Sequence, residues 1–257
     1  MEWKKKIYEH AVKELNIDTA KDREAAYILS KMICSYSSSL DEVKLILSKF
    51  KTAIVLGAGP SLEQDVENAA RLGIIDKAGI IAADGAACLL LKYNITPHAV
   101  VSDLDGPRDC LLKASELGSF IFVHAHGDNI ALIREIVPLL LRGKILGTTQ
   151  VEEIACLYNF GGFTDGDRAV LLCETLGVDR IILAGMDFGF EIGKYSKSGE
   201  LTSKELVRKR KKLRIGKMVL EEFAKNSKVE LYDATSGSGG IKGFKKITWE
   251  RTKELVE

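Results

Sequence analysis

The hydrophobic residues follow two patterns along the chain. Up to about residue 50 they recur every three or four positions, as in the set Tyr8, Val12 and Leu15, which is the spacing of a helix with one buried face. From residue 52 onward, short apolar runs are each followed by Gly, Asp or Ser and then by a helical stretch, a pattern typical of buried parallel strands with crossover helices. The pattern predicts a helical cap over residues 1–50 and an α/β domain over residues 51–257.

Seven of these apolar runs are predicted to be strands. They are Ala53–Leu56, Gly79–Ala83, Ala99–Ser102, Phe120–Val123, Lys144–Leu146, Arg180–Ala184 and Val229–Tyr232. Strands that alternate with helices predict a doubly wound, mostly parallel sheet of the Rossmann-like class. Ligands bind such sheets beyond the carboxyl ends of the strands, so the residues that follow each run are the candidates for function. A run of small residues at 235–240 predicts a mobile loop.

The composition narrows the class of partner. Lys and Arg total 37 against 36 for Asp and Glu, so the formal charge of +1 provides no long-range field for nucleic acid or a membrane surface. No apolar stretch approaches the roughly 20 residues that a membrane span needs. We therefore expect a soluble, cytoplasmic protein that binds neither nucleic acid nor membrane, and a homo-oligomer is left open. The high content of Lys and Glu, with glutamine only at Gln64 and Gln150, is typical of proteins from thermophiles.

The five cysteines lie far apart in the sequence and form no C-x-x-C pair. That spacing argues against a zinc ribbon and against a redox motif. The five residues are therefore predicted to be buried, reduced thiols of a cytosolic protein.

A glycine-rich turn follows the first predicted strand, with the sequence Gly57-Ala58-Gly59-Pro60-Ser61-Leu62. Glycine permits close approach of the backbone, and free N–H groups at the start of a helix hold phosphate, so Gly57, Gly59 and Ser61 are predicted to form a phosphate cradle. Leu62 stands where a dinucleotide fingerprint has its third glycine, and the turn lacks the lysine of a P-loop. The alternative is a tight strand-to-helix turn with Ser61 as the helix cap.

Three carboxylates follow the next two strands. Asp84 comes directly after the second strand, and Asp103 and Asp105 follow the third at a spacing of two, which points both side chains the same way in an extended segment. Neighbouring anions repel unless a positive charge lies between them, and Mg²⁺ takes one or two protein carboxylates together with water and substrate phosphates. The sequence therefore predicts a magnesium site at Asp84, Asp103 and Asp105, with a turn held by Asx hydrogen bonds as the alternative.

The fourth strand runs into a polar segment, His124-Ala125-His126-Gly127-Asp128-Asn129. Two histidines at this spacing could bind zinc, but no third suitable ligand lies nearby in the sequence. His126, Asp128 and Asn129 are therefore predicted to contact phosphate or substrate. His124 has the alternative role of shaping the loop.

A second polar segment precedes an apolar helix. Thr164, Asp165, Asp167 and Arg168 surround the predicted start of that helix, where a negative charge or a phosphate is favoured. Capping explains one Asp or Thr, and a salt bridge could account for Arg168. The full set nevertheless favours contact with a ligand.

Two further features stand near strand ends or on a late helix. Asp187 follows the sixth strand and is predicted to contact the substrate. The basic run Arg208–Lys212 could clamp a triphosphate, but a charge run on a helix is usually a solvated face, so the predicted site does not include it.

Taken together, the Gly-Ala-Gly-Pro-Ser-Leu, Ala-Asp-Gly-Ala, Ser-Asp-Leu-Asp-Gly, His-Ala-His-Gly-Asp-Asn, Thr-Asp-Gly-Asp-Arg-Ala and Gly-Met-Asp-Phe segments resemble the archaeal 6-hydroxymethyl-7,8-dihydropterin pyrophosphokinase family. The resemblance covers the chain from about residue 50 to its end. The middle portion also resembles the catalytic domain of thiamin pyrophosphokinase, with Ser102 in place of the glycine before Asp103. Only one clear strand follows residue 225, so we do not expect the all-β C-terminal domain of the thiamin enzymes. This expectation disfavours thiamin as the substrate.

The resemblance implies a magnesium-dependent transferase that moves a diphosphate group from ATP to a reduced pterin in pterin or folate-type cofactor biosynthesis. It implies that residues 51–257 form the catalytic domain. The implied catalytic residues are Asp84, Asp103, Asp105, His126 and Asp128, and the first three of them would hold the metal. The implied nucleotide contacts are Gly57, Gly59, Ser61, Asn129 and Arg168. The implied substrate contacts are Thr164, Asp165, Asp167 and Asp187.

Three other functions remain alternatives. The same domain resembles part of the motility-associated glycosyltransferases, which use nucleotide-activated sugars, although the chain is short for one. A non-catalytic nucleotide sensor would use the same loops without turnover. A dinucleotide-dependent oxidoreductase is disfavoured because Leu62 interrupts the fingerprint and clustered acids would repel a pyrophosphate.

Overall fold

The computed structural model describes residues 2–189, 191–196, 202–237 and 240–257. In this part of the chain one sheet of nine strands runs in the order β6-β5-β4-β3-β2-β1-β7-β8-β9, and every neighbouring pair is parallel. The strands are β1 (Thr52–Leu56), β2 (Gly79–Ala83), β3 (Ala99–Ser102), β4 (Phe120–Ala125), β5 (Lys144–Thr149), β6 (Leu157–Tyr158), β7 (Arg180–Ala184), β8 (Glu230–Asp233) and β9 (Lys245–Lys246). The predicted doubly wound α/β fold is confirmed.

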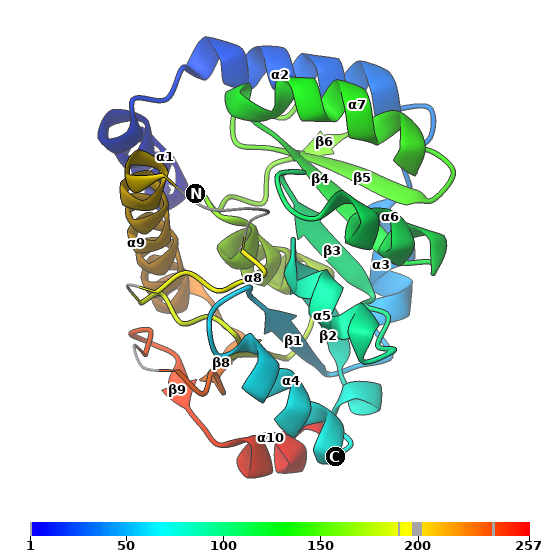
Figure 1. Ribbon diagram of the computed structural model, residues 1–257, viewed down its shortest axis with the longest axis vertical. Coiled ribbons are helices and arrows are strands. Elements are labelled where there is room, and N and C mark those ends of the chain that lie inside the picture. The colour runs from blue at the N-terminus through cyan, green and yellow to red at the C-terminus, as the bar shows by residue number, and fades with distance from the viewer. Residues whose placement is uncertain (1, 190, 197–201, 238–239) are drawn as a thin grey trace.

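Helices cover both faces of this sheet (Figure 1). They are α1 (Glu2–Leu15), α2 (Thr19–Ile33), α3 (Leu40–Leu47), α4 (Leu62–Arg71), α5 (Ala86–Lys92), α6 (Arg108–Glu116), α7 (Ile130–Leu140), α8 (Asp165–Leu176), α9 (Ser203–Asn226) and α10 (Trp249–Val256), with short 3-10 turns η1 (Ile75–Lys77) and η2 (Gly127–Asn129). Among the described residues, no helix is long and apolar enough to span a lipid bilayer.

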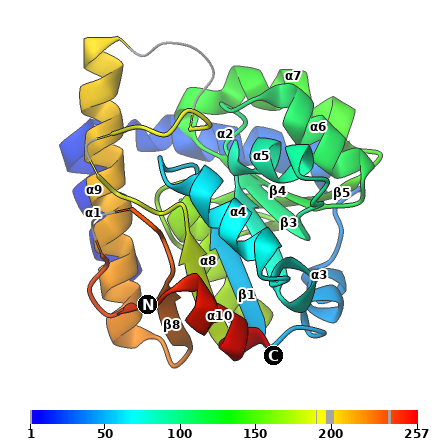
Figure 2. The ribbon, with the colours of Figure 1, turned by 60° about the horizontal axis from the view of Figure 1, so that its bottom comes forward.

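The buried side chains of the central strands alternate between the two faces. Ile54 and Leu56 belong to one hydrophobic cluster, which also contains residues of α2, α4, α5, α6, α7 and α10. Ala53 and Val55 belong to the other cluster, which contains residues of α1, α3, α8 and α9. Because both faces of β1 are covered, all five of its residues are buried, which is why the strand reads as a continuous apolar run. The N-terminal helices take part in both layers: α1 lies beside α9 (Figure 2), α2 packs on β5 and α7, and α3 packs on α8.

The strand order reverses at β1. The chain builds β1 to β6 in one direction and then returns through α8 to place β7 on the other side of β1. The chain leaves β1 for α4 and leaves β7 for α9, and these two helices belong to the hydrophobic clusters on opposite faces of the sheet. Doubly wound folds bind ligands in the crevice at the carboxyl edge of such a reversal point.

All seven predicted strands are present, and β2, β3 and β7 have the predicted bounds. Two elements were missed, namely β6 and β9, which are two-residue strands at the edges and too short to show a pattern. β4 and β5 extend beyond their apolar runs, and His124 pairs in register with Thr148 inside the sheet. Ser238 and Gly239 of the predicted mobile loop lie outside the described residues. Ser236 of the same loop is hydrogen bonded to the buried carboxylate of Asp65.

The prediction that all five cysteines are buried, reduced thiols was wrong for four of them. Cys34 forms a disulfide with Cys156, and Cys88 forms one with Cys110, across separations of 122 and 22 residues. Cys34 is exposed, and only Cys173 is a free, buried thiol. The spacing carried no signal because the folded sheet, and not the local sequence, brings α2 to the β5–β6 loop and α5 to α6. Intracellular disulfides are known from hyperthermophiles, so the bonds do not conflict with the composition.

A thiol titration tests this pairing. The chain unfolded in guanidinium chloride without reductant should react with one equivalent of a thiol reagent, at Cys173, and with five equivalents after reduction. Reduction should also lower the free energy of unfolding by about 2–5 kcal/mol, because the unfolded chain gains conformational freedom. Five reactive thiols in the unreduced protein would contradict the pairing.

Candidate active site

A cavity of about 450 Å³ opens at the crevice, where the loops after β1, β2, β3, β4 and β7 meet the N-terminus of α8. Its lining includes most of the residues predicted from the sequence. These are Gly57, Gly59, Asp84, Asp103, Asp105, His126, Asp128, Asn129, Thr164, Asp165 and Asp187. Ser61, Asp167 and Arg168 do not line this cavity. The parallel strands thus bring together segments up to about 130 residues apart, because their carboxyl ends share one edge of the sheet.

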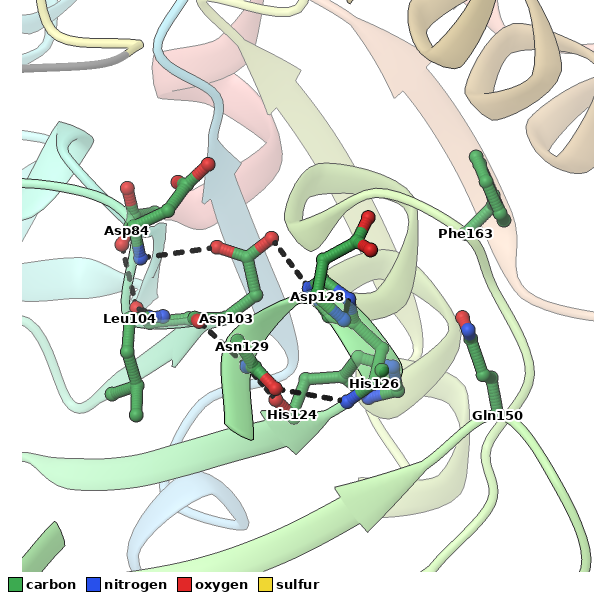
Figure 3. A network of polar contacts seen from close by, with 12 residues as sticks. Asp84, Asp103, Leu104, His124, His126, Asp128, Asn129, Gln150 and Phe163 are labelled. Carbon is green, nitrogen blue, oxygen red and sulfur yellow. Dashed lines mark hydrogen bonds and ion pairs between the residues drawn. The ribbon is translucent and has the colours of Figure 1, made fainter. Parts of the chain in front are cut away.

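Among the acidic residues that line this cavity, Asp84, Asp103, Asp105 and Asp165 act on one another electrostatically and form a cluster of carboxylates. Figure 3 shows the Asp103 carboxylate between the loop that carries Asp84 and the loop that carries His126 and Asp128. Asp84 Oδ1 accepts a hydrogen bond of 2.6 Å from Ser102 Oγ, the last residue of β3. The β3 loop passes so close that a Cβ atom on Gly106 would lie 1.9 Å from Asp84 Oδ2, so only glycine fits there.

The backbone at these strand ends is strained. Leu104 has a φ of 71°, in the left-handed region that a residue of its type rarely adopts, and Asp84, of a type that tolerates this region better, has a φ of 43°. Leu104 is buried, and its N–H donates to Ser102 Oγ at 2.9 Å, which holds the turn. Such strain concentrates at functional sites, where the surrounding structure fixes an otherwise unfavourable geometry.

The carboxylates perturb one another. Withdrawal from water and the charge of Asp103 raise the pKa of Asp84 to about 7. The same two causes raise the pKa of Asp105 to about 6, although its side chain is more exposed, and burial followed by the charge of Asp103 raises the pKa of Asp165 well above its usual value. Asp84, Asp105 and Asp165 therefore stay protonated to a higher pH than usual unless a cation binds among them.

Asp103 is the exception. Burial alone would raise its pKa, but the hydrogen bond from His126 and the positive charge of Lys212 outweigh burial and hold the pKa below its ordinary value. His126 Nδ1 accepts from the backbone N–H of Asp128 at 3.2 Å, which places the proton of a neutral ring on Nε2, 3.3 Å from Asp103 Oδ2. Asp103 is thus the carboxylate that stays ionised within the cluster.

Asn129 is buried and fixes the two loops that carry these groups. Its Nδ2 donates to the backbone oxygens of Asp103 and His124, both at 2.7 Å, and its Oδ1 accepts from the N–H of His126 at 3.0 Å. The amide group of Asn129 makes its hydrogen bonds to the protein, so this residue positions Asp103 and His126.

The glycine-rich turn lines the cavity, but its geometry differs from that of a simple phosphate cradle. The N–H groups of Gly57 and Gly59 donate to the carbonyls of Ala184 and Gly185, and Ser61 donates to Asp187 Oδ2 through both N and Oγ. A Cβ atom on Gly59 would lie 2.0 Å from Asp187 Oδ2. The glycines therefore let the β1 and β7 loops pack together, and Ser61 makes no side-chain cap on α4.

Of the four ligand contacts predicted at the start of α8, two line the cavity and two do not. The Asp167 carboxylate accepts from the N–H groups of Phe163 and Thr164 and from Thr164 Oγ1, so it completes a capping box at the start of α8. Arg168 Nη2 donates to Gln150 Oε1 at 2.9 Å and to the Phe163 carbonyl at 3.1 Å. Thr164 and Asp165 remain as the cavity-lining pair of this segment.

The sequence interpretation missed the basic run of α9. Arg208, Lys209 and Lys212 line the cavity, and Arg208 pairs with Asp128 at 2.9 Å. Lys212 is one of the charges that lower the pKa of Asp103. The spacing of four between Arg208 and Lys212 places them on one face of the helix, but nothing in the sequence shows that this face lies over the strand ends.

Asp65 was also missed. It is fully buried on α4, and its carboxylate accepts from the N–H of Gly185 at 2.7 Å, from Ser236 through N and Oγ, and from Trp249 Nε1 at 3.1 Å. Burial raises its pKa despite these donors. The residue ties the β7 loop, the β8 loop and α10 to α4, although in the sequence it reads as an ordinary acid in the first turn of a helix.

The carboxylates provide the hard oxygen ligands that Mg²⁺ prefers, and their raised pKa values fit a site completed by a cation. Among residues 2–189, 191–196, 202–237 and 240–257, no group of three or more His, Cys, Asp or Glu side chains is already arranged to hold a metal ion. The magnesium site at Asp84, Asp103 and Asp105 therefore stays a prediction.

Comparison with known proteins identifies relatives of the chain. A family model described as 6-hydroxymethylpterin diphosphokinase MptE-like matches residues 26–193. Proteins named 6-hydroxymethyl-7,8-dihydropterin pyrophosphokinase are 39% identical in Pyrococcus furiosus, over 90% of this chain and 97% of the relative, and 38% identical in Methanothermobacter thermautotrophicus, over 87% and 95%. Among solved structures, the MAf glycosyltransferase of Magnetospirillum magneticum has a similar fold, with a TM-score of 0.52 at 14% identity, over 86% of this chain and 41% of that one.

The raised pKa of Asp84 predicts a pH-dependent effect of removing its charge. In the unfolded chain Asp84 ionises near pH 3.8 and in the folded chain near 7, so the stability that it contributes is present at low pH and is lost as the pH rises through about 7. In EDTA, Asp84→Asn should raise Tm at pH 8 by at least about 2 °C and less at pH 5. Thermal unfolding followed by circular dichroism at the two pH values measures this difference.

The exposed Asp76 provides the control. Asp76→Asn should change the free energy of unfolding by less than about 0.5 kcal/mol at either pH. An Asp84→Asn variant that is equally destabilised at both pH values would contradict the assigned electrostatics.

Proposed function

The chain belongs to the MptE-like family of 6-hydroxymethylpterin diphosphokinases, and from this premise we propose that it transfers a diphosphate group from ATP to 6-hydroxymethyl-7,8-dihydropterin with the help of Mg²⁺. The observation that carries the proposal is one cavity lined both by a cluster of carboxylates and by three cations of α9. Acids that need a cation and bases that attract anions are the two components required to hold a metal-bound triphosphate.

The proposed reaction exchanges one phosphorus–oxygen bond for another. The hydroxymethyl oxygen of the pterin attacks the β-phosphorus of ATP, the bond from that phosphorus to the oxygen bridging to the α-phosphorus breaks, and AMP leaves with the bridging oxygen. The proton of the hydroxyl group is released. The products are the pterin diphosphate and AMP, and no covalent intermediate with the protein is needed.

Asp84, Asp103 and Asp105 are the residues that would hold Mg²⁺, with Asp103 as the permanently ionised member. When bound, the ion would offset negative charge on the phosphate oxygens and orient them. His126 supports this role by donating its Nε2 proton to Asp103, which fixes the direction of the carboxylate. Asn129 fixes the backbone on both sides of that contact.

The cations of α9 would supply the remaining positive charge. Arg208, Lys209 and Lys212 line the same cavity as the carboxylates, and Lys209 is oriented by a hydrogen bond of 2.6 Å from Nζ to the Ser196 carbonyl. Fixed cations act most strongly on charge that develops in a site shielded from water, so they would stabilise the transferring diphosphate and the leaving phosphate of AMP.

Phosphorus NMR tests the proposed activity directly. Purified protein with ATP, Mg²⁺ and 6-hydroxymethyl-7,8-dihydropterin should produce AMP and a new diphosphate ester in equal amounts. Thiamin in place of the pterin, omission of an acceptor, addition of EDTA, and the variants Asp103→Ala and Asp105→Ala should each prevent formation of the ester. Formation of ADP would indicate transfer of one phosphate, and binding of ATP without AMP would indicate a nucleotide sensor; either result contradicts the proposal.

Substitution of Lys212 tests the role of α9. Lys212→Ala should lower kcat on the order of 100-fold, because it removes a cation beside the transferred group while leaving the substrate pockets in place. Steady-state release of AMP measures the effect. The neighbouring Lys211 pairs with Glu14 at 3.4 Å and does not line the cavity, so Lys211→Ala should change kcat by less than about threefold. Equal losses in both variants would contradict a specific role of Lys212.

A further inference from the structure

A second, smaller cavity of about 230 Å³ adjoins the first. Its outer wall is the α1–α2 loop, and its inner wall includes His124, Gln150 and Arg168. The two cavities share lining residues, among them Asp103 and Asp165, so they meet at the carboxylate cluster. The family assignment does not say what this cavity holds.

His124 lines this second cavity next to the Gln150 side chain, and one of its ring nitrogens makes no hydrogen bond of normal geometry among the described residues. The side chain is 1% exposed, and its Nδ1 lies 3.0 Å from Thr148 Oγ1. Its Nε2 is buried and has no hydrogen-bond partner among the described residues. A buried polar atom without a partner is costly, and a bound ligand with a complementary group would remove that cost.

The wall around His124 is a fixed polar network. Asp22 is buried and accepts from Tyr8 Oη at 2.7 Å and from Gln150 Nε2 at 2.8 Å, and Gln150 Oε1 in turn accepts from Arg168. Hydrogen bonds therefore hold the carboxylate, the amide and the guanidinium in place before a ligand arrives. Phe163 lines the same cavity and adds an aromatic ring.

We propose that this second cavity is the acceptor site, in which a planar, nitrogen-rich heterocycle binds beside His124 Nε2 with its hydroxymethyl group directed to the junction at Asp103. The inference rests on the proposed function and specifies where its two substrates lie. A planar ring with alternating N–H donors and nitrogen or carbonyl acceptors matches a wall of fixed donors and acceptors.

The sizes and positions of the cavities support this division. The second cavity is smaller than the range of about 300–1,000 Å³ typical of sites for larger ligands, so it suits a two-ring heterocycle, whereas the first, at about 450 Å³, has room for a nucleotide. In-line transfer also requires the attacking oxygen and the leaving group on opposite sides of the phosphorus. Two cavities that meet at the carboxylate cluster provide separate approaches to it.

The first test is a split of kinetic constants. His124→Phe retains a ring but removes Nε2, and it should raise KM for 6-hydroxymethyl-7,8-dihydropterin at least about tenfold, the effect of one lost hydrogen bond, while KM for ATP changes less than about twofold. His98 directly precedes β3 and therefore lies at the amino ends of the strands, whereas both cavities lie at the carboxyl ends. His98→Phe should therefore leave both constants unchanged. A rise in KM for ATP alone, or no rise in either, overturns the inference.

The second test uses the unaltered chain and does not depend on folding of a variant. Long-range proton–nitrogen NMR of the four imidazoles should show a shift at His124 Nε2 when 6-hydroxymethylpterin is added, and none when α,β-methylene-ATP is added. A shift caused by the nucleotide analogue, or saturating pterin binding without a shift at His124, overturns the inference while leaving the activity intact. Absence of both pterin binding and AMP formation would overturn the proposed function together with the inference.

Discussion

Mutual repulsion among the carboxylates at the carboxyl edge of the sheet is the constraint on which the rest of the site depends. Asp84, Asp103 and Asp165 lie in one cavity, and withdrawal from water makes each charge harder to hold beside the others. His126 and Lys212 lower the pKa of Asp103 specifically. The result is one permanent anion surrounded by acids that ionise readily only when a cation is present, which suits a site that should assemble around a metal-bound substrate.

The scaffold that holds this repulsive cluster depends on another buried carboxylate. Asp65 lies behind the β1 loop and binds the β7 loop and the β8 loop through Gly185 and Ser236. Its hydrogen bonds are made to protein donors, so it stiffens the crevice at the reversal point of the sheet and does not compete for ligand. The two buried aspartates therefore differ in their surroundings: Asp65 accepts hydrogen bonds from Gly185, Ser236 and Trp249, whereas Asp84 lines the cavity.

Sequence patterns predicted what the parallel topology determines. Buried central strands appear in the sequence as apolar runs, and parallel strands end at one edge of the sheet. Asp84, Asp103 and His126 could therefore be placed together from the sequence. Features set by tertiary contacts could not be found in this way. The position of Arg208 over the strand ends depends on how α9 packs against α1, the two disulfides depend on which helices become neighbours, and the amides of Gly57 and Gly59 are occupied by a loop more than 120 residues away. The two-residue strand β6 is too short to carry any periodic signal.

This chain shares its fold with a glycosyltransferase, and a shared fold does not determine which substrate is bound. At 14% identity the two chains share an architecture, and such an architecture offers a crevice at the same edge whatever is bound there. Discrimination must then come from side chains that this chain adds at the strand ends and from the elements that close the crevice. Here those elements are the α1–α2 loop, which forms the outer wall of the second cavity, and α9, which brings cations to both cavities. Because α1 packs on α9, the N-terminal helices and the basic helix are structurally coupled, and a change in either would act on the proposed acceptor and phosphate sides of the site together.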